Sequence, residues 1–214
     1  MADEATPEVY QIHIWIRHIS PMIWRRLLMR ADSTLANLHD AIQIAFGWSD
    51  FHLHRFRIHG RDYGVNRVGG LGFSQDARTV RLADFRFRTN ERFLYEYDFG
   101  DGWQHEVRVE RRLTVESDRT YPVCVGGQRS APPEDCGGPW SFLERRDAVP
   151  GQVREHLERL LEGIEAADPE AIRDELEVVD SLHAWLTLDR FDRRAVNRRL
   201  RLYAAGDARW REEP

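Results

Sequence analysis

The feature that most constrains the fold lies within residues 92–113. Two segments there, in which apolar and polar side chains alternate, are joined by a turn that contains two glycines. Aromatic side chains occupy every second position before the turn, at Phe93, Tyr95, Tyr97 and Phe99. The turn reads Gly100-Asp101-Gly102, and apolar side chains alternate again after it. Period-two alternation is typical of a strand with one buried face, and glycine adopts the positive φ angles of a tight reversal. The sequence therefore predicts a β-hairpin over residues 92–113, with Asp98, Asp101 and His105 near its tip.

The rest of the chain combines strand patterns with one early helix pattern. Alternation predicts further strands over residues 10–17, 23–29 and 52–59. Apolar residues at helical spacing predict an amphipathic helix from Leu35 to Phe46. Residues 60–77 and 121–139 are rich in glycine or proline, and we expect irregular loops there.

Helical patterns dominate from residue 139 onward. We expect helices over residues 140–146, 153–166, 169–179 and 191–204. Strands around one early helix, followed by helices, indicate an α+β fold: a mostly antiparallel sheet with that helix packed on it and a helical C-terminal region.

Length and composition favour one domain. The chain has 214 residues, 42% of them hydrophobic, which is enough for one sizeable core. We expect that domain over residues 7–205, with a sheet-rich core over 7–138 and a helical part over 139–205. Residues 206–214 are expected to form a tail.

All 31 basic residues are arginines. A GC-rich genome is one explanation, and selection for bidentate anion recognition is the other. The net charge of −5 excludes a chain that is basic throughout, as general nucleic-acid binders are. Positive charge gathers in residues 1–92 and 190–201, whereas residues 144–180 hold 12 acids against 5 arginines. We therefore expect any anion-binding surface in the first two regions.

The two cysteines bear on compartment and chemistry. No apolar run approaches the roughly 20 residues of a membrane span, and the first residues lack the design of a signal peptide. We expect a cytoplasmic protein without membrane contact. Disulfides are unusual in that compartment, so Cys124 and Cys136 are either reduced structural thiols or metal ligands.

A zinc site is the most specific function that these residues suggest. Cys124 and Cys136 flank a loop of glycines and prolines, and His52, His54 or His105 would supply nitrogen ligands. Zinc sites use four ligands, usually with closely spaced cysteine pairs, whereas eleven residues separate these two thiols. Thiols that simply pack the loop are the alternative, and we expect no cofactor, with zinc as the less favoured option.

The hairpin tip and the cysteine loop are the best place for a pocket. The ligand-binding candidates are Asp98, Asp101, Trp103, His105, Glu134 and Asp135. Glycines let backbones approach closely, and prolines hold an irregular loop in one shape. We expect the two segments to pack together and line the main cleft. The alternative is that the loop only covers a sheet edge.

Arginines near the early strands are candidates for nucleic-acid contact. They are Arg25, Arg26, Arg55 and Arg57, together with the arginines of residues 193–201. Side chains of this kind bind phosphate, but a tryptophan such as Trp24 on a strand is more often core, with its neighbouring arginines solvated.

Several segments together resemble the plasmid pRiA4b ORF-3-like family. They are residues 21–26 (PMIWRR), 35–39 (LANLH), 42–43 (IQ), 46–48 (FGW), 52–56 (HLHRF), 95–105, 121–124 (YPVC), 132–140 (PPEDCGGPW) and 195–200 (AVNRRL), in order over nearly the whole chain. The resemblance implies a small α+β protein found on plasmids, chromosomes and insertion elements, often labelled a resolvase-like passenger, with no established activity. One departure is Ala131, where relatives usually carry a third cysteine.

Familiar nucleophile motifs are absent. There is no Gly-x-Ser-x-Gly elbow, no phosphate loop and no His-Glu-x-x-His. A serine recombinase needs an activated N-terminal serine, but Ser20 precedes a proline at a strand break. We therefore predict a non-catalytic binding or accessory module, associated with mobile elements, that contacts nucleic acid or a protein partner. The alternative is a metal-dependent hydrolase whose site lies around residues 98–105 and the cysteine loop.

Overall fold

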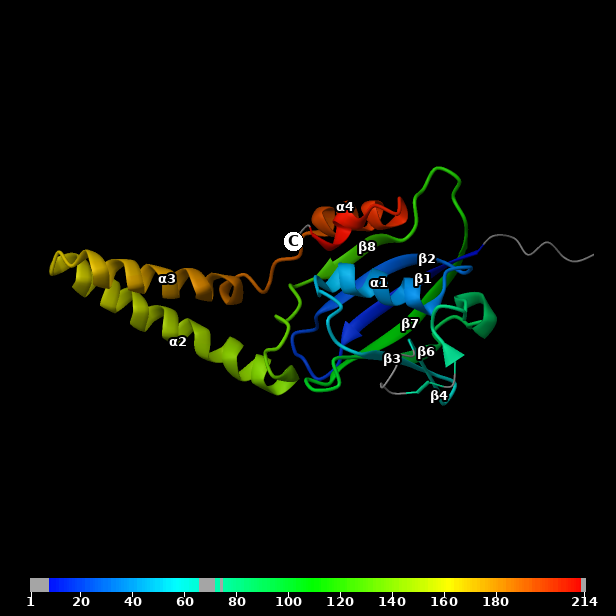
Figure 1. Cartoon of the computed structure of the whole chain (residues 1–214), viewed down its shortest axis with the longest axis horizontal. Coiled ribbons are helices and arrows are strands. Elements are labelled where there is room, and N and C mark those ends of the chain that lie inside the picture. Colours follow the sequence, from blue (N-terminus) through cyan, green and yellow to red (C-terminus); the bar gives the residue numbers. More distant parts are fainter. Residues whose placement is uncertain (1–7, 66–71, 74, 213–214) are drawn as a thin grey trace, which may run out of the picture.

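A single sheet forms the body of the protein, and a pair of long helices projects from one end as an arm (Figure 1). The computed structural model describes residues 8–65, 72–73 and 75–212. The strands are β1 (Glu8–Ile16), β2 (Trp24–Arg30), β3 (His54–Ile58), β4 (Arg61–Gly64), β5 (Gln75–Asp76), β6 (Arg92–Tyr97), β7 (Trp103–Thr114) and β8 (Val123–Gln128). The helices are α1 (Leu35–Phe46), α2 (Gly138–Glu165), α3 (Pro169–Leu186) and α4 (Arg193–Ala204), with short 3-10 turns η1 (Leu82–Phe85) and η2 (Ala208–Arg211).

The described strands form an eight-stranded sheet in the order β5-β4-β3-β6-β7-β1-β2-β8. Each neighbouring pair is antiparallel except β4 and β5, which run parallel. The predicted α+β fold with a mostly antiparallel sheet is confirmed. No helix in the described part of the chain is long and apolar enough to cross a bilayer.

The hairpin is formed by β6 and β7, as the alternation predicts. Tyr97 pairs with Trp103 at the tip, and Gly102 adopts a φ of 68° in the turn. Tyr95, Tyr97 and Trp103 are fully buried. The rings of Tyr95, Tyr97 and Trp103 thus face the core, as the alternation predicts.

Helix α1 has the bounds that the sequence predicts. Thr34 and Asn37 form a capping box at its start, and Gly47 ends it with a φ of 77°. Its apolar face, which includes Leu35 and Leu38, is buried against the sheet. The helix lies across one face of that sheet (Figure 1).

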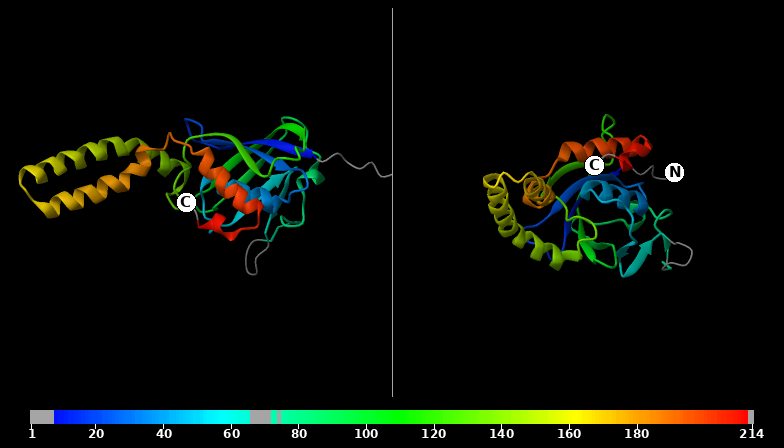
Figure 2. Two further views of the ribbon diagram at one scale, coloured as in Figure 1. Left: turned by 90° about the horizontal axis from the view of Figure 1, so that it is seen from above. Right: turned by 60° about the vertical axis from the view of Figure 1, so that its left-hand side comes forward.

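The helical region divides between an arm and the body. Helices α2 and α3 pair with each other away from the sheet, whereas α4 returns to pack on β8 and α1 (Figure 2). The Asn197 amide anchors α4, because it accepts from the backbone N–H of Cys124 and donates to its carbonyl oxygen, both at 2.8 Å. Residues 206–212 are also packed, since Trp210 is buried and its carbonyl oxygen accepts from Arg199.

Two sequence predictions about regular structure are wrong in part. The expected break between helices 140–146 and 153–166 does not occur, and α2 continues through Pro150. The neighbouring Val149 is buried, so packing outweighs the local preference for a break.

The loop predicted over residues 121–139 contains β8. Glycines in this strand provide room for rings, because a Cβ on Gly127 would lie 2.3 Å from the Phe191 ring, and one on Gly126 would lie 3.3 Å from the Trp24 ring. Within the loop predicted over residues 60–77, β4 and β5 form at the ends, and residues 66–71 and 74 lie outside the described residues.

Candidate functional site

Three segments that are distant in sequence meet beside the hairpin tip. They are the connection from α1 to β3, the β6–β7 turn, and the loop from β8 to α2. The Trp48 indole N–H donates to the Pro132 carbonyl oxygen at 2.9 Å, and the Gly137 N–H donates to Asp101 Oδ2 at 3.1 Å. The hairpin tip and the cysteine loop therefore contact each other, as predicted.

His52 lies between two carboxylates at this junction. Its Nε2 is 3.1 Å from Asp135 Oδ1, and its Nδ1 is 3.8 Å from Asp98 Oδ1. One ligand atom from each of the three residues lies within 4.8 Å of the others. The Asp98 side chain is only 10% exposed, whereas that of Asp135 is 75% exposed and that of His52 is 30% exposed. The cluster thus has one buried wall and an open side.

The turn geometry fixes Asp98. Its φ is 54°, and its Oδ1 accepts hydrogen bonds from the backbone N–H groups of Gly100 and Asp101 at 2.9 and 3.3 Å. Asp135 also has a left-handed φ, of 57°. Aspartate tolerates this region better than most residues because its side chain bonds to nearby backbone.

Glu134 locks the loop onto the body. Its Oε1 accepts from the Tyr97 hydroxyl at 2.5 Å, and its Oε2 accepts from the backbone N–H and hydroxyl of Ser49. Burial and the Glu134 carboxylate raise the pKa of Tyr97 well above its ordinary value. Glu134 is therefore a positioning residue for the neighbouring Asp135.

His39, Asp50 and His54 form a second polar cluster, in which both histidines are buried. His39 and His54 stack with ring centroids 3.5 Å apart and an interplanar angle of 12°. His39 Nε2 lies 2.7 Å from Asp50 Oδ1, and its Nδ1 lies 2.8 Å from the Tyr95 hydroxyl. Imidazole lone pairs lie in the ring plane, so two nearly parallel rings do not direct them at one ion. We interpret this cluster as a set of hydrogen bonds that holds the connection from α1 to β3 in place.

The fully buried His105 is not part of the cluster of His52, Asp98 and Asp135. Its ring packs edge-on against Phe46 and Trp48, and it contacts Tyr95. Burial lowers the pKa of His105 to about 3, so the imidazole is neutral. Trp103 is buried in the same core. The expectation that His105 and Trp103 take part in a ligand or metal site is therefore corrected.

The two thiols do not join the histidines either. Cys124 is buried in β8 and its thiol donates to the Gly126 carbonyl oxygen at 3.2 Å. Cys136 is half-buried, and burial and the charge of Asp101 raise its pKa to about 11. Both remain free thiols.

The predicted convergence of His52, His54, His105, Cys124 and Cys136 on one metal does not occur among the described residues. The structure divides the two neighbouring histidines between different clusters. His52 joins Asp98 and Asp135, while His54 joins His39 and Asp50.

Comparison with known proteins identifies the family. A family model described as plasmid pRiA4b ORF-3-like protein matches residues 8–199. The chain belongs to the plasmid ORF-3-like family. It is 31% identical over 161 residues to the uncharacterized protein y4hQ of Sinorhizobium fredii, covering 75% of this chain and 82% of that protein. The crystal structure of MM3350 from Methanosarcina mazei Go1, a protein of unknown function, is similar with a TM-score of 0.65 and 31% identity, covering 89% of this chain and 97% of that one.

The first group of nucleic-acid candidates in this family member is engaged internally. Arg25 is buried, donates to the Ala45 carbonyl oxygen at 2.7 Å, and lies 4.0 Å from the Phe191 ring centroid. The other three pair with carboxylates: Arg26 with Glu110, Arg55 with Glu96, and Arg57 with Asp62. Arg25 is therefore a core residue rather than the surface contact that the sequence suggested.

Helix α4 retains an open basic row. Arg194, Arg198 and Arg201 are exposed at i, i+4 and i+7, and none forms a side-chain hydrogen bond or ion pair with a residue that the structure describes. This part of the predicted arginine surface remains available to an anion.

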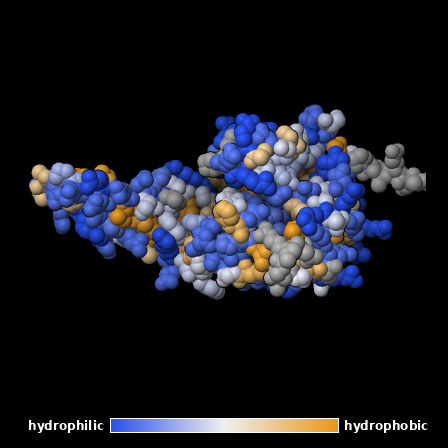
Figure 3. Space-filling model, viewed as in Figure 1, coloured by the Kyte–Doolittle hydropathy of each residue, from blue (hydrophilic) through white to orange (hydrophobic). Residues whose placement is uncertain are grey.

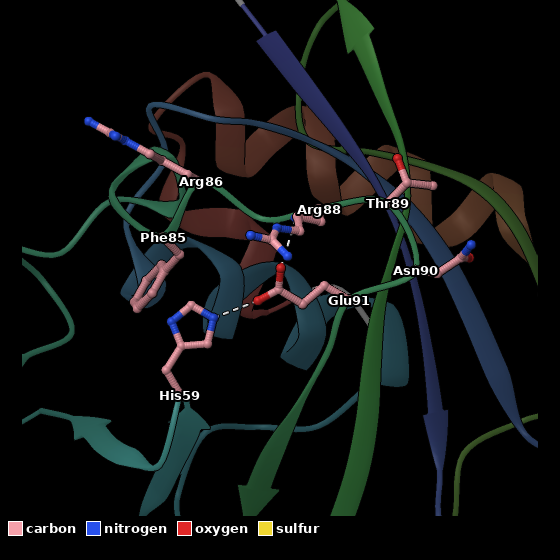
Figure 4. Close-up of a pocket in the computed structure, with 7 residues that line it drawn as sticks. All are labelled: His59, Phe85, Arg86, Arg88, Thr89, Asn90 and Glu91. Atoms are coloured by element: carbon pink, nitrogen blue, oxygen red, sulfur yellow. Dashed lines mark hydrogen bonds and ion pairs between the residues drawn. The ribbon is translucent and has the colours of Figure 1, made fainter.

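A separate hollow lies at the opposite end of the hairpin from His52. Figure 4 shows its lining, in which His59 Nε2 lies 2.5 Å from Glu91 Oε1 and the backbone N–H of Arg88 donates to Glu91 Oε2. The hollow has a volume of about 600 Å³, and Arg86 points away from its centre in that view. None of the residues predicted at the hairpin tip lines this hollow.

The sequence analysis did not single out His39, Asp50 and Tyr97, which lie around the hairpin tip. His39 had a detectable signal, because it falls on the mainly apolar face of α1, as Gln43 does. Asp50 had none, since an aspartate after a helix is typical of any turn.

Proposed function

We propose that this plasmid ORF-3-like protein is a binding module that holds a divalent transition-metal ion beside its hairpin tip, with His52, Asp98 and Asp135 as the protein ligands. The observation that carries the proposal is the convergence of these three side chains, from separate segments, to within 4.8 Å. Imidazole suits zinc, iron and nickel, and carboxylate suits manganese and magnesium. One imidazole with two carboxylates therefore favours zinc or manganese over calcium.

Local charge supports a cation here. The hairpin turn and the cysteine loop contribute four carboxylates, from Asp98, Asp101, Glu134 and Asp135. Glu134 and Asp101 accept hydrogen bonds from Tyr97 and Gly137, whereas the carboxylates of Asp98 and Asp135 lie beside His52. Either an imidazolium or a metal ion neutralises this pair, and only the metal adds coordination bonds.

The required rearrangement is small. Two ligand atoms about 2.1 Å from a tetrahedral ion lie about 3.4 Å apart, and the three ligand atoms now lie within 4.8 Å of one another. Asp135 is the residue able to close the difference, because its side chain is 75% exposed. Asp98 supplies the fixed wall, since its turn holds it in place.

The open side of the cluster favours a second candidate function, metal-dependent hydrolysis. Catalytic zinc sites keep three protein ligands and leave the fourth position to water, whose pKa the metal lowers to about 7. The exposure of Asp135 leaves such a position accessible to solvent.

Metal binding is tested with purified protein by elemental analysis and by calorimetric titration with Zn²⁺ and Mn²⁺. We expect one equivalent to bind, and His52→Ala, Asp98→Asn and Asp135→Asn each to weaken binding by roughly tenfold or more. His59→Ala and Asp62→Asn are matched controls at other positions, and both should bind as the parent does. Absence of binding, or equal binding by Asp135→Asn, would contradict the proposal.

Hydrolysis is tested separately on the metal-loaded protein with bis(p-nitrophenyl) phosphate. Turnover that depends on the added metal and disappears in Asp135→Asn would favour the hydrolase. Binding of the metal without turnover of this diester would favour a module whose role is recognition.

A further inference from the structure

The arm formed by α2 and α3 presents an apolar stripe that no described residue covers. Leu157, Leu161 and Ile164 on α2 are 44%, 60% and 54% exposed, and Leu176 on α3 is 50% exposed. Figure 3 shows apolar side chains at the surface along this arm. Side chains of this size are normally placed inside, so four of them close together mark a surface for contact.

The packing of the arm places the four residues on one side. Residues 163 and 172 approach each other between the two helices near the tip of the arm, and the His156 side chain bonds to Glu175 across the pair. Each stripe residue on α2 follows one of the packed positions 156, 160 and 163, and Leu176 follows Glu175. In two antiparallel helices, residues one position beyond the packed row turn to the same side of the pair.

Carboxylates border the stripe on both sides. One exposed glutamate follows each stripe residue along its helix: Glu158, Glu162 and Glu165 on α2, and Glu177 on α3. Residues 144–180 carry a net charge of 5 − 12 = −7. Glu158 is 3.7 Å from Arg154, whereas Glu162 and Glu165 form no ion pair with a described residue. The surface is therefore an apolar strip between two negative rows.

We infer that the arm is a docking surface for a cationic amphipathic helix of a partner protein. Such a helix lays its apolar face on the strip formed by Leu157, Leu161, Ile164 and Leu176, and its flanking arginines or lysines meet the two carboxylate rows. Charge complementarity selects this occupant. A second copy of the arm, packed strip to strip, would bring like-charged rows together and be repelled.

The base of the arm is built to hold this surface rigidly. The Phe142 and Trp185 rings pack there at a tilt of 32° with centroids 5.6 Å apart, and Arg145 lies over the Trp185 ring at 4.8 Å. Val149 and Leu182 are buried in the same place. A preorganised surface loses little freedom when a partner binds.

The experiment uses the full chain and a fluorescently labelled model peptide of about 18 residues, with leucine and arginine at helical spacing, followed by anisotropy. A peptide of the same composition in scrambled order is the control for non-specific charge. We expect the amphipathic peptide to bind and to become helical, and the scrambled one to bind much more weakly. Binding should weaken as salt is raised, because the flanking pairs are exposed.

Variants separate the two parts of the surface. Leu157→Ser with Leu161→Ser should weaken peptide binding by roughly tenfold or more, because each lost leucine removes burial. Glu158→Gln, Glu162→Gln and Glu165→Gln together should weaken it and flatten its salt dependence. Met22→Ser removes a similarly exposed side chain from the body and should have no effect. Circular dichroism should report unchanged helix in every variant, since these positions are exposed.

Three outcomes would overturn the inference. They are equal binding of the scrambled peptide, unchanged binding after the two leucine substitutions, and a dimer in light scattering that Leu161→Ser dissociates, which would assign the stripe to a second copy. None depends on His52 or on bound metal, so failure here and failure of the metal proposal are distinguishable.

Discussion

The Tyr97 hydroxyl donates to Glu134 Oε1 across 2.5 Å, which joins the end of β6 to the loop that carries Asp135. Tyr97→Phe leaves a carboxylate without one of its donors, and we expect a loss of roughly 1–3 kcal/mol in the free energy of unfolding. Because the loop is then held less firmly, Zn²⁺ affinity should fall as well. Urea denaturation measures the first effect and calorimetry the second. Tyr121→Phe, at a weaker and exposed hydrogen bond, should change neither.

Gly138 and Gly47 form a matched pair for testing the contact between α2 and the hairpin. Both adopt left-handed backbone, with φ of 79° and 77°. A Cβ at 138 would lie 2.3 Å from the Asp101 carbonyl oxygen, whereas one at 47 would meet nothing within 4 Å. Gly47→Ala should therefore cost about 1–2 kcal/mol of conformational strain, and Gly138→Ala distinctly more. Equal losses in denaturant midpoints would show that α2 shifts freely away from the hairpin.

His105 should make the protein sensitive to acid. Burial lowers its folded pKa to about 3 from 6.5, so as pH falls below 6.5 the unfolded state binds a proton that the folded state does not. Stability is then fully present above pH 6.5 and declines toward pH 3, by up to about 1.4 kcal/mol per pH unit.

His105→Leu keeps an uncharged side chain in the core and should flatten that part of the pH dependence, measured by urea denaturation at several pH values. His183→Leu, on the exposed arm, should leave it unchanged. A parent-like slope in His105→Leu would mean that other groups cause the acid sensitivity.

Any binding of DNA or RNA is expected to depend on the open row of α4. Arg194→Gln, Arg198→Gln and Arg201→Gln together should reduce the dependence of log affinity on log salt by roughly 3, because each phosphate contact on duplex DNA contributes about 0.9. Arg57→Gln, at an arginine already paired with Asp62, should matter little. Anisotropy titrations from low to moderate salt give the slopes, and no binding at low salt would end this hypothesis.

The sequence predicted the hairpin, α1 and the α+β class because each rests on local periodicity that side-chain burial preserves. Helix α1 also had unambiguous boundaries, Thr34 before it and Gly47 after it. Strand β8 was missed because its glycines suggest a loop. Their space is filled by the rings of Trp24 and Phe191, which are distant in sequence. The helix break predicted near Pro150 was wrong for a similar reason. Burial of Val149 depends on tertiary packing, which local sequence does not show.

The candidate site was predicted only in part. The hairpin tip and the cysteine loop were expected to pack together, and their contact brings Asp98 and Asp135 near each other. Sequence alone could not separate His52 from His54, since the strand begins only at His54 and His52 therefore leaves the alternation. The burial of Arg25 was equally hidden, because its charge is compensated by carbonyl oxygens and aromatic rings rather than by an acid with a recognisable spacing.

The 28 residues of α2 give the arm its reach. At 1.5 Å per residue that helix is about 42 Å long, and the stripe lies in its outer half. The protein should therefore sediment more slowly, and scatter X-rays with a larger radius of gyration, than a sphere of 25.2 kDa. A molecule held near the arm's tip stands clear of anything held at the hairpin tip, so the chain has the proportions of a spacer that keeps two bound objects apart.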